Sequence, residues 1–206
     1  MNKNKTRYIT RLAMLMAVML VLDITPLGYI KYGTIEITTM MIPVMIGAAI
    51  MGPATGAILG AFFGITSFLQ CLGIPSISLF GSTLLSINWF YTLLVCMLPR
   101  IAMGVLSGYV FRWVQKVDKT GFASYIVSAL TAAITNTVLF TGMVLLLFGS
   151  TDYIQGMRGG LSILAFAVAF VGLNGLIEAV FCTLIGGTSA KVLTKIGERT
   201  SRTSKR

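Results

Sequence analysis

The stretch Ile87–Trp113, INWFYTLLVCMLPRIAMGVLSGYVFRW, decides how this chain folds. As a helix it is about 40 Å long, enough to cross a lipid bilayer, and Arg100 lies near its middle. A cation near the bilayer midplane costs roughly 2.5–3.5 kcal/mol on insertion scales. Such a charge is tolerated where it faces the interior of a helix bundle and meets an anion, a hydrogen-bond acceptor or a ligand. The stretch therefore predicts a membrane-spanning helix that contributes a cation to a buried polar site.

The composition of the whole chain indicates an all-α integral membrane protein. Hydrophobic residues make up 56% of the 206 residues and charged residues 11%, whereas about 25% charged residues is usual in a soluble domain. We expect one membrane domain over residues 1–206, a bundle of six transmembrane helices. The outer loop after the first helix contains a short alternating piece, Ile35-Glu36-Ile37. The predicted spans are residues 8–22, 39–51, 53–70, 87–113, 122–148 and 161–193.

Most of the basic residues, which outnumber the acidic ones and give a net charge of +10, lie in alternate connections or at the span ends next to them. They gather before the first predicted span, after the fourth and after the sixth, and only Lys31 and Arg158 lie in the other loops. This is the positive-inside pattern, so it predicts that both termini are cytoplasmic and that the number of spans is even. The distribution favours contact with a lipid surface and argues against a nucleic-acid partner.

Polar residues lie at matched depth in three of the predicted spans. Arg100, Asn136 and Glu178 are each near the middle of a span, and Asn174 is one turn from Glu178 on the same helix face. Two interpretations remain open. In the first, Arg100 and Glu178 form a structural ion pair that is hydrogen-bonded to the asparagines. In the second, the group binds a ligand. We favour the ligand site, because ionisable groups inside membranes usually serve function.

An outward-facing rim is predicted above this group. Gln70 lies at the end of the third span, and Asn88 and Trp89 lie at the start of the fourth. These residues are assigned to the substrate-binding set, although an aromatic residue at that depth is also typical of a simple interfacial anchor.

No metal site is expected. The chain has no histidine, and its three cysteines, Cys71, Cys96 and Cys182, are far apart in the sequence with no CxxC spacing. We expect all three to be thiols.

Small residues recur at helical spacing in two predicted spans. Ala13 and Ala17 form one such pair, which either packs inside the bundle or docks on another membrane subunit. The second set favours close packing within the bundle over a partner-binding surface, and it consists of Gly52, Gly56, Gly60 and Gly64.

The chain resembles the substrate-binding S-component of energy-coupling factor (ECF) transporters, and within that family it is most similar to the pantothenate type. The runs that carry the resemblance are Ala13–Ala17, Ile35–Thr38, Ile42–Ala48, Met51–Pro53, Gly56–Gly60, Gly64–Phe68, Pro99–Ile101 and Thr135–Thr137.

The resemblance implies six helices with both termini inside, and a pocket built from spans four to six and capped by the first and third loops. It implies a multi-pass protein of a prokaryotic cell membrane that binds a B vitamin, with pantothenate favoured. It also implies that Ala13 and Ala17 contact a transmembrane coupling subunit, which works with two cytoplasmic ATPases. This chain has no GxxxxGK[ST] motif. We therefore expect no cofactor and no enzymatic activity in it, with ATP used by the partners.

Two alternative functions remain open. One alternative is an S-component for another vitamin, such as riboflavin, and a second is a stand-alone ion-coupled carrier in which Glu178 titrates. An intramembrane protease is disfavoured, because the chain lacks histidine, a pair of aspartates on two spans and an HExxH motif.

Overall fold

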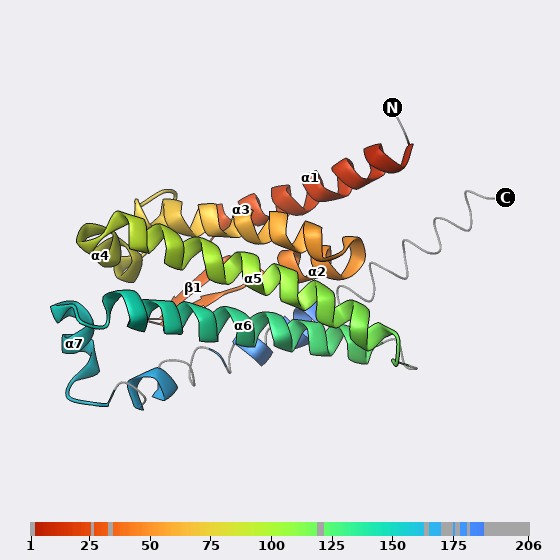
Figure 1. Cartoon of the computed structure of the whole chain (residues 1–206). Coiled ribbons are helices and arrows are strands. Elements are labelled where there is room, and N and C mark those ends of the chain that lie inside the picture. The colour runs from red at the N-terminus through yellow and green to blue at the C-terminus, as the bar shows by residue number, and fades with distance from the viewer. Residues whose placement is uncertain are drawn as a thin grey trace.

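The structure is a computed structural model that describes residues 3–25, 27–32, 35–118, 122–162, 165–169, 175, 178–180 and 182–187. These residues are predominantly helical, as predicted, with one antiparallel hairpin of two short strands (Figure 1). The elements are α1 (Lys3–Ile24), β1 (Tyr29–Tyr32), β2 (Ile35–Thr38), α2 (Met41–Met51), α3 (Pro53–Cys71), α4 (Leu79–Ile87), α5 (Trp89–Gln115), α6 (Ala123–Phe148), α7 (Asp152–Arg158) and the π-helix η1 (Cys182–Gly187).

Three of the described helices, α3, α5 and α6, are long and apolar enough to cross a membrane. Helix α2 is shorter, with 11 residues, but neighbouring elements shield it, since Pro43 and every residue from Val44 to Ala48 are buried. The described residues include only fragments of the sixth predicted span, so its bounds lie outside them. The count of six spans therefore stays a prediction.

Helix α5 begins two residues later than the predicted span because a separate helix precedes it. The side chain of Asn88 accepts hydrogen bonds from the backbone N–H groups of Phe90 and Tyr91, which caps α5 at its first turn. The chain before this cap, predicted as a loop, contains α4, whose own cap is Ser78. Helix α7 likewise lies in a predicted loop.

Helices α3 and α5 touch along their backbones. A Cβ atom at Gly56 would overlap the carbonyl oxygen of Gly104, and one at Gly60 would overlap the carbonyl oxygen of Arg100. Only glycine permits this approach. The prediction that the glycine face packs inside the bundle is confirmed, and this contact fixes the height of Arg100 relative to α3.

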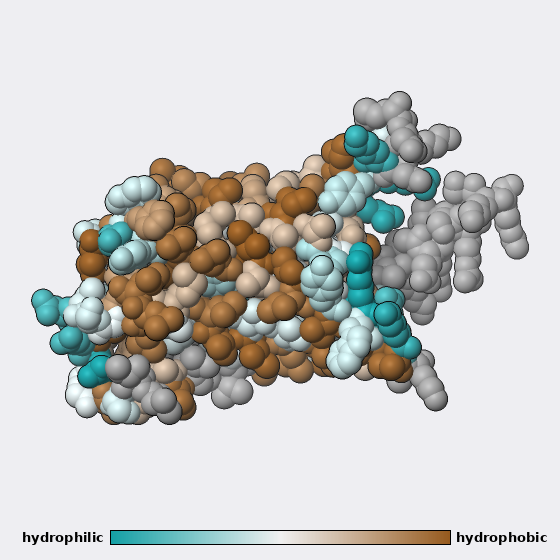
Figure 2. All heavy atoms as spheres, viewed as in Figure 1, coloured by the Kyte–Doolittle hydropathy of each residue, from teal (hydrophilic) through white to brown (hydrophobic). Residues whose placement is uncertain are grey.

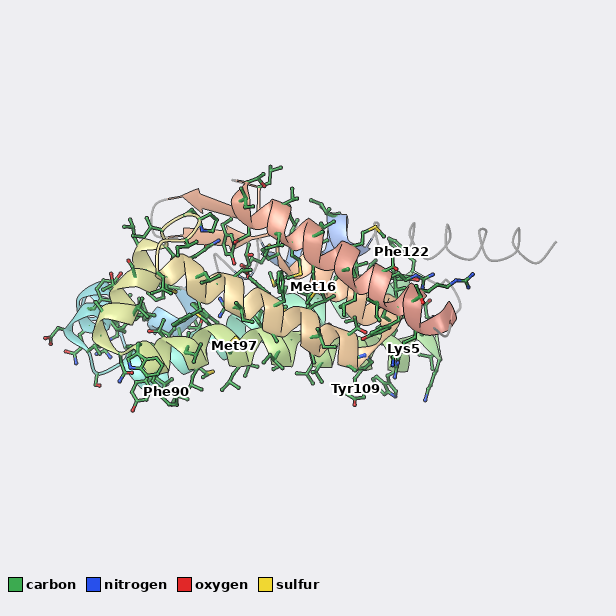
Figure 3. All side chains as sticks on the ribbon, turned by 90° about the horizontal axis from the view of Figure 1, so that it is seen from above. Lys5, Met16, Phe90, Met97, Tyr109 and Phe122 are labelled. Atoms are coloured by element: carbon green, nitrogen blue, oxygen red, sulfur yellow. The ribbon has the colours of Figure 1, made fainter. Side chains whose placement is uncertain are left out.

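The surface is divided into an apolar band and two hydrophilic ends (Figure 2). Lys5 and Phe122 lie near one end and Phe90 near the other (Figure 3). The start of α1 and the connection from α5 to α6 therefore share an end. Exposed basic residues belong to these segments, namely Lys5, Arg7, Arg11, Arg112 and Lys116. This grouping agrees with the charge pattern, while the side of the membrane that this end faces stays a prediction.

Candidate functional site

A cavity lies among α3, α4, α5, α6, the hairpin and Glu178. Measured as the space open to the centre of a water molecule, its volume is ≈ 90 Å³. A single water needs about 10–15 Å³ on this measure, so the cavity is large enough for several waters or a small organic molecule. Of the predicted site residues, it brings together Gln70, Arg100, Asn136 and Glu178.

Arg100 is positioned by the proline before it. Pro99 lies inside α5 and has no N–H, so the carbonyl oxygen of Val95, four residues earlier, lacks its helical donor. Nη1 of Arg100 donates to this oxygen at 2.7 Å, and Nη2 donates to the hydroxyl of Ser67 in α3 at 3.4 Å. The carbonyl oxygen that Pro99 leaves without a helical donor therefore fixes the position of the Arg100 guanidinium.

Two aromatic rings hold the same guanidinium. Its Cζ atom lies 4.6 Å from the ring centroid of Phe140 in α6 and 5.4 Å from that of Phe63 in α3. Both distances are within the range of cation–π attraction. Arg100 is 7% exposed, so these rings and the two hydrogen bonds replace water around much of the charge.

Four buried polar atoms at the cavity have no hydrogen-bond partner among the residues that the structure describes. They are the hydroxyl of Tyr29, Nε of Arg100, Oδ1 of Asn136 and Oγ1 of Thr141. Buried polar atoms are paired in most native structures, with protein, water or ligand. Two donor–acceptor hydroxyls, a cationic donor and an amide acceptor therefore remain for a guest in this cavity.

Glu178 is engaged by the protein. Its Oε1 accepts from the backbone N–H of Thr38, at the end of β2, at 3.3 Å, and its Oε2 accepts from the hydroxyl of Thr137 at 3.1 Å. Within the described part of the chain, no ion pair joins Glu178 to Arg100. The direct ion pair of the structural interpretation is thus not formed, although both residues line the same cavity.

Gln70 connects the cavity to α1. Its Nε2 donates to Oδ1 of Asp23 at 2.6 Å, and both side chains are buried. Asp23 directly follows the first predicted span, residues 8–22. A carboxylate at the end of such a span was the available signal for this contact.

The rim residues differ from expectation. Asn88 and Trp89 do not line the cavity. The Asn88 side chain is occupied as the cap of α5, and Trp89, in the first turn, is 64% exposed. Asn174 lies outside the described residues.

Sequence reasoning missed several residues of the cavity wall. On α6, Thr137, Phe140 and Thr141 join Asn136 at helical spacing, so polar residues recurring on one face of an apolar span were the signal. Tyr29 gave no such signal, because it reaches the cavity from the hairpin.

The predicted partner-binding pair lies on the outer face of α1. Ala13 and Ala17 are both exposed, while α1 packs on the core through Leu12, Leu15, Met16 and Met19. The alanines thus do not form the packing face of α1. Among the described residues, no group of three or more Cys, Asp or Glu side chains could hold a metal ion.

Comparison with known proteins connects this architecture to transport. Residues 7–186 match the family described as "ECF transporter, substrate-specific component". The chain is 29% identical over 203 residues to the pantothenic acid transporter PanT of Lactococcus lactis subsp. cremoris. This match covers 95% of this chain and 97% of the relative. It is also 29% identical over 210 residues to the pantothenate transporter PanT of Leuconostoc mesenteroides, with 97% and 98% covered.

Proposed function

This chain belongs to the family of substrate-specific components of ECF transporters, and we propose that it binds pantothenate outside the cell for ATP-driven uptake by partner subunits. It is a multi-pass protein of a prokaryotic plasma membrane, and it is a transport protein rather than an enzyme. The choice of pantothenate is supported by the names of the two relatives. The partners and the transport cycle are inferred from the family.

The observation that carries the proposal is the set of four polar atoms in the cavity that find no partner within the described part of the chain. Pantothenate has a carboxylate at one end, an amide in the middle and two hydroxyls at the other end. Arg100 uses one N–H of each terminal nitrogen, so Nε and the remaining N–H groups suit a carboxylate. Oδ1 of Asn136 can accept from the amide N–H, and the hydroxyls of Thr141 and Tyr29 can pair with those of the ligand.

Binding of a panel of labelled B vitamins to the purified chain tests this assignment. Pantothenate should bind with the highest affinity, and unlabelled pantothenate should displace it while riboflavin should not. High-affinity binding of another vitamin, with none for pantothenate, would contradict the assignment and leave the family membership intact.

The proposed assembly has six spans with both termini cytoplasmic, a coupling membrane subunit and two cytoplasmic ATPases. The exposed Ala13 and Ala17 suit a close approach by a partner helix. Replacing both by Trp should abolish ATP-dependent uptake and leave pantothenate binding to the isolated chain nearly unchanged. Equal loss of binding and uptake would show that the bundle itself needs these alanines.

A further inference from the structure

Two thiols lie in contact in the cavity wall, and the proposed function uses neither of them. Cys71 is the last residue of α3 and Cys96 lies in α5, yet their sulfur atoms are 3.9 Å apart. Both are thiols, both are buried, and both line the cavity. A small molecule that enters the cavity therefore meets two adjacent sulfurs.

We propose that Cys71 and Cys96 form a reversible oxidation site, at which a small peroxide converts the two thiols into a disulfide that weakens substrate binding. The sulfurs must approach from 3.9 Å to about 2.05 Å. The helices that carry them are already in contact, because a Cβ atom at Gly64 in α3 would lie 2.9 Å from the carbonyl oxygen of Cys96. Forming the disulfide therefore requires this wall to move locally, so that the sulfurs approach by about 2 Å.

The hydrogen bonds distinguish the two sulfurs. The Ser67 hydroxyl donates to Sγ of Cys96 at 3.9 Å and itself accepts from Arg100, so a chain of donors leads from the cation to this sulfur. The thiol of Cys71 instead donates to the carbonyl oxygen of Ser67 at 3.3 Å. Donors stabilise a thiolate and acceptors retain a thiol proton. Cys96 is therefore the attacking residue and Cys71 the resolving one.

The reaction balances as a two-electron exchange. The Cys96 thiolate attacks one oxygen of hydrogen peroxide, the O–O bond breaks, and hydroxide leaves as water with the proton that the thiol gave up. The sulfur of Cys71 then attacks the sulfenic sulfur of Cys96, the S–O bond breaks, and a second water carries away the Cys71 proton. Two thiols and one peroxide thus yield one disulfide and two waters.

The effect on the substrate rests on the proposed function. Cys71 packs against α4, where a Cβ atom at Gly81 would lie 2.5 Å from its sulfur. Ser67, which contacts both Cys96 and Arg100, belongs to the same wall. Moving Cys71 towards Cys96 therefore changes both the contact of Cys71 with α4 and the surroundings of the Arg100 guanidinium.

The site is tested by treating the full chain, purified in detergent, with hydrogen peroxide and mapping its peptides without reduction. A Cys71–Cys96 disulfide should form in the wild type and in Cys182→Ser, the matched control, because Cys182 is equally buried but does not line the cavity. In Cys71→Ser no disulfide should form, and Cys96 should be oxidised further. Absence of the disulfide-linked Cys71–Cys96 peptide in Cys182→Ser would overturn the proposal. Preferential oxidation of Cys182 in the wild type would also overturn it.

Binding of labelled pantothenate is then measured before oxidation, after it and after reduction with dithiothreitol. Affinity should fall at least tenfold and recover, in the wild type and in Cys182→Ser alike. A disulfide that leaves affinity unchanged would overturn its effect on the substrate. If the reduced protein does not bind pantothenate at all, the proposed function fails, while peptide mapping still decides whether the oxidation site exists.

Discussion

Arg100 and Glu178 are buried ionisable residues that line one cavity, but they differ in how fully their polar atoms are hydrogen-bonded. Arg100 is held by a carbonyl, a hydroxyl and two rings, and none of the described residues pairs with its Nε. Both oxygens of Glu178 are hydrogen-bonded, one to the end of β2 and one to α6. Arg100 is thus fixed in position with donors to spare, whereas Glu178 ties the hairpin to the bundle.

This difference separates two roles that a charge inside a membrane protein can have. A buried group with unpaired hydrogen-bonding atoms is prepared for a guest, because leaving those atoms without any partner is costly. A buried group whose atoms are all paired stabilises the structure around it. We therefore expect changes at Arg100 to act mainly on affinity and changes at Glu178 to act mainly on stability.

The largest effect is expected at Arg100. Arg100→Ala removes the cation that the pantothenate carboxylate would meet, so binding should weaken by about 2–5 kcal/mol, measured by titration calorimetry. Arg100→Lys should recover little, because an ammonium is a point charge without the planar pair of donors.

A double variant tests the comparison itself. If the two residues served mainly each other, Arg100→Ala would misfold and adding Glu178→Ala would rescue it. Wild-type affinity in Arg100→Ala/Glu178→Ala would remove Arg100 from the binding site. We expect instead that the double variant binds no better than Arg100→Ala.

A smaller loss is expected at Asn136, whose Oδ1 is another of the unpaired atoms. Asn136→Ala should weaken pantothenate binding by about 1–3 kcal/mol, the usual effect of leaving a neutral partner unpaired. Asn88→Ala is the matched control, because this asparagine caps α5 and does not line the cavity. It should lower the free energy of unfolding by about 1 kcal/mol and leave affinity unchanged. Similar affinity losses in the two variants would mean that the unpaired atoms do not mark the ligand's contacts.

Part of this site could be predicted because polar residues are rare in apolar helices. That rarity alone indicated Arg100, Asn136 and Glu178, and the run of apolar residues located α5 to within two residues at each end. The hydrogen bond from Arg100 to the Val95 carbonyl oxygen could also be predicted, since Pro99 cannot donate to that oxygen.

The rest depended on contacts between distant segments. Cys71 and Cys96 meet only because the glycines of α3 fix its height against α5. Tyr29 reaches the cavity because the hairpin lies beside it. The positions of Asn88 and Trp89 outside the cavity could not be predicted, because nearness to a helix start in sequence does not say whether a side chain caps the helix or faces the cavity.

The smallest effect on affinity is expected at Glu178. Glu178→Gln keeps one acceptor but places an NH₂ group where the carboxyl accepts a hydrogen bond, from either Thr38 or Thr137. The loss of one such bond should lower the free energy of unfolding by about 0.5–1.5 kcal/mol, measured by thermal unfolding in detergent, and change pantothenate affinity less than Asn136→Ala does. ATP-dependent uptake by the assembled transporter should persist. A stand-alone carrier that moves a proton on Glu178 would lose uptake entirely in this variant, because an amide cannot titrate. Loss of uptake with binding intact would therefore reverse the roles assigned to the two residues.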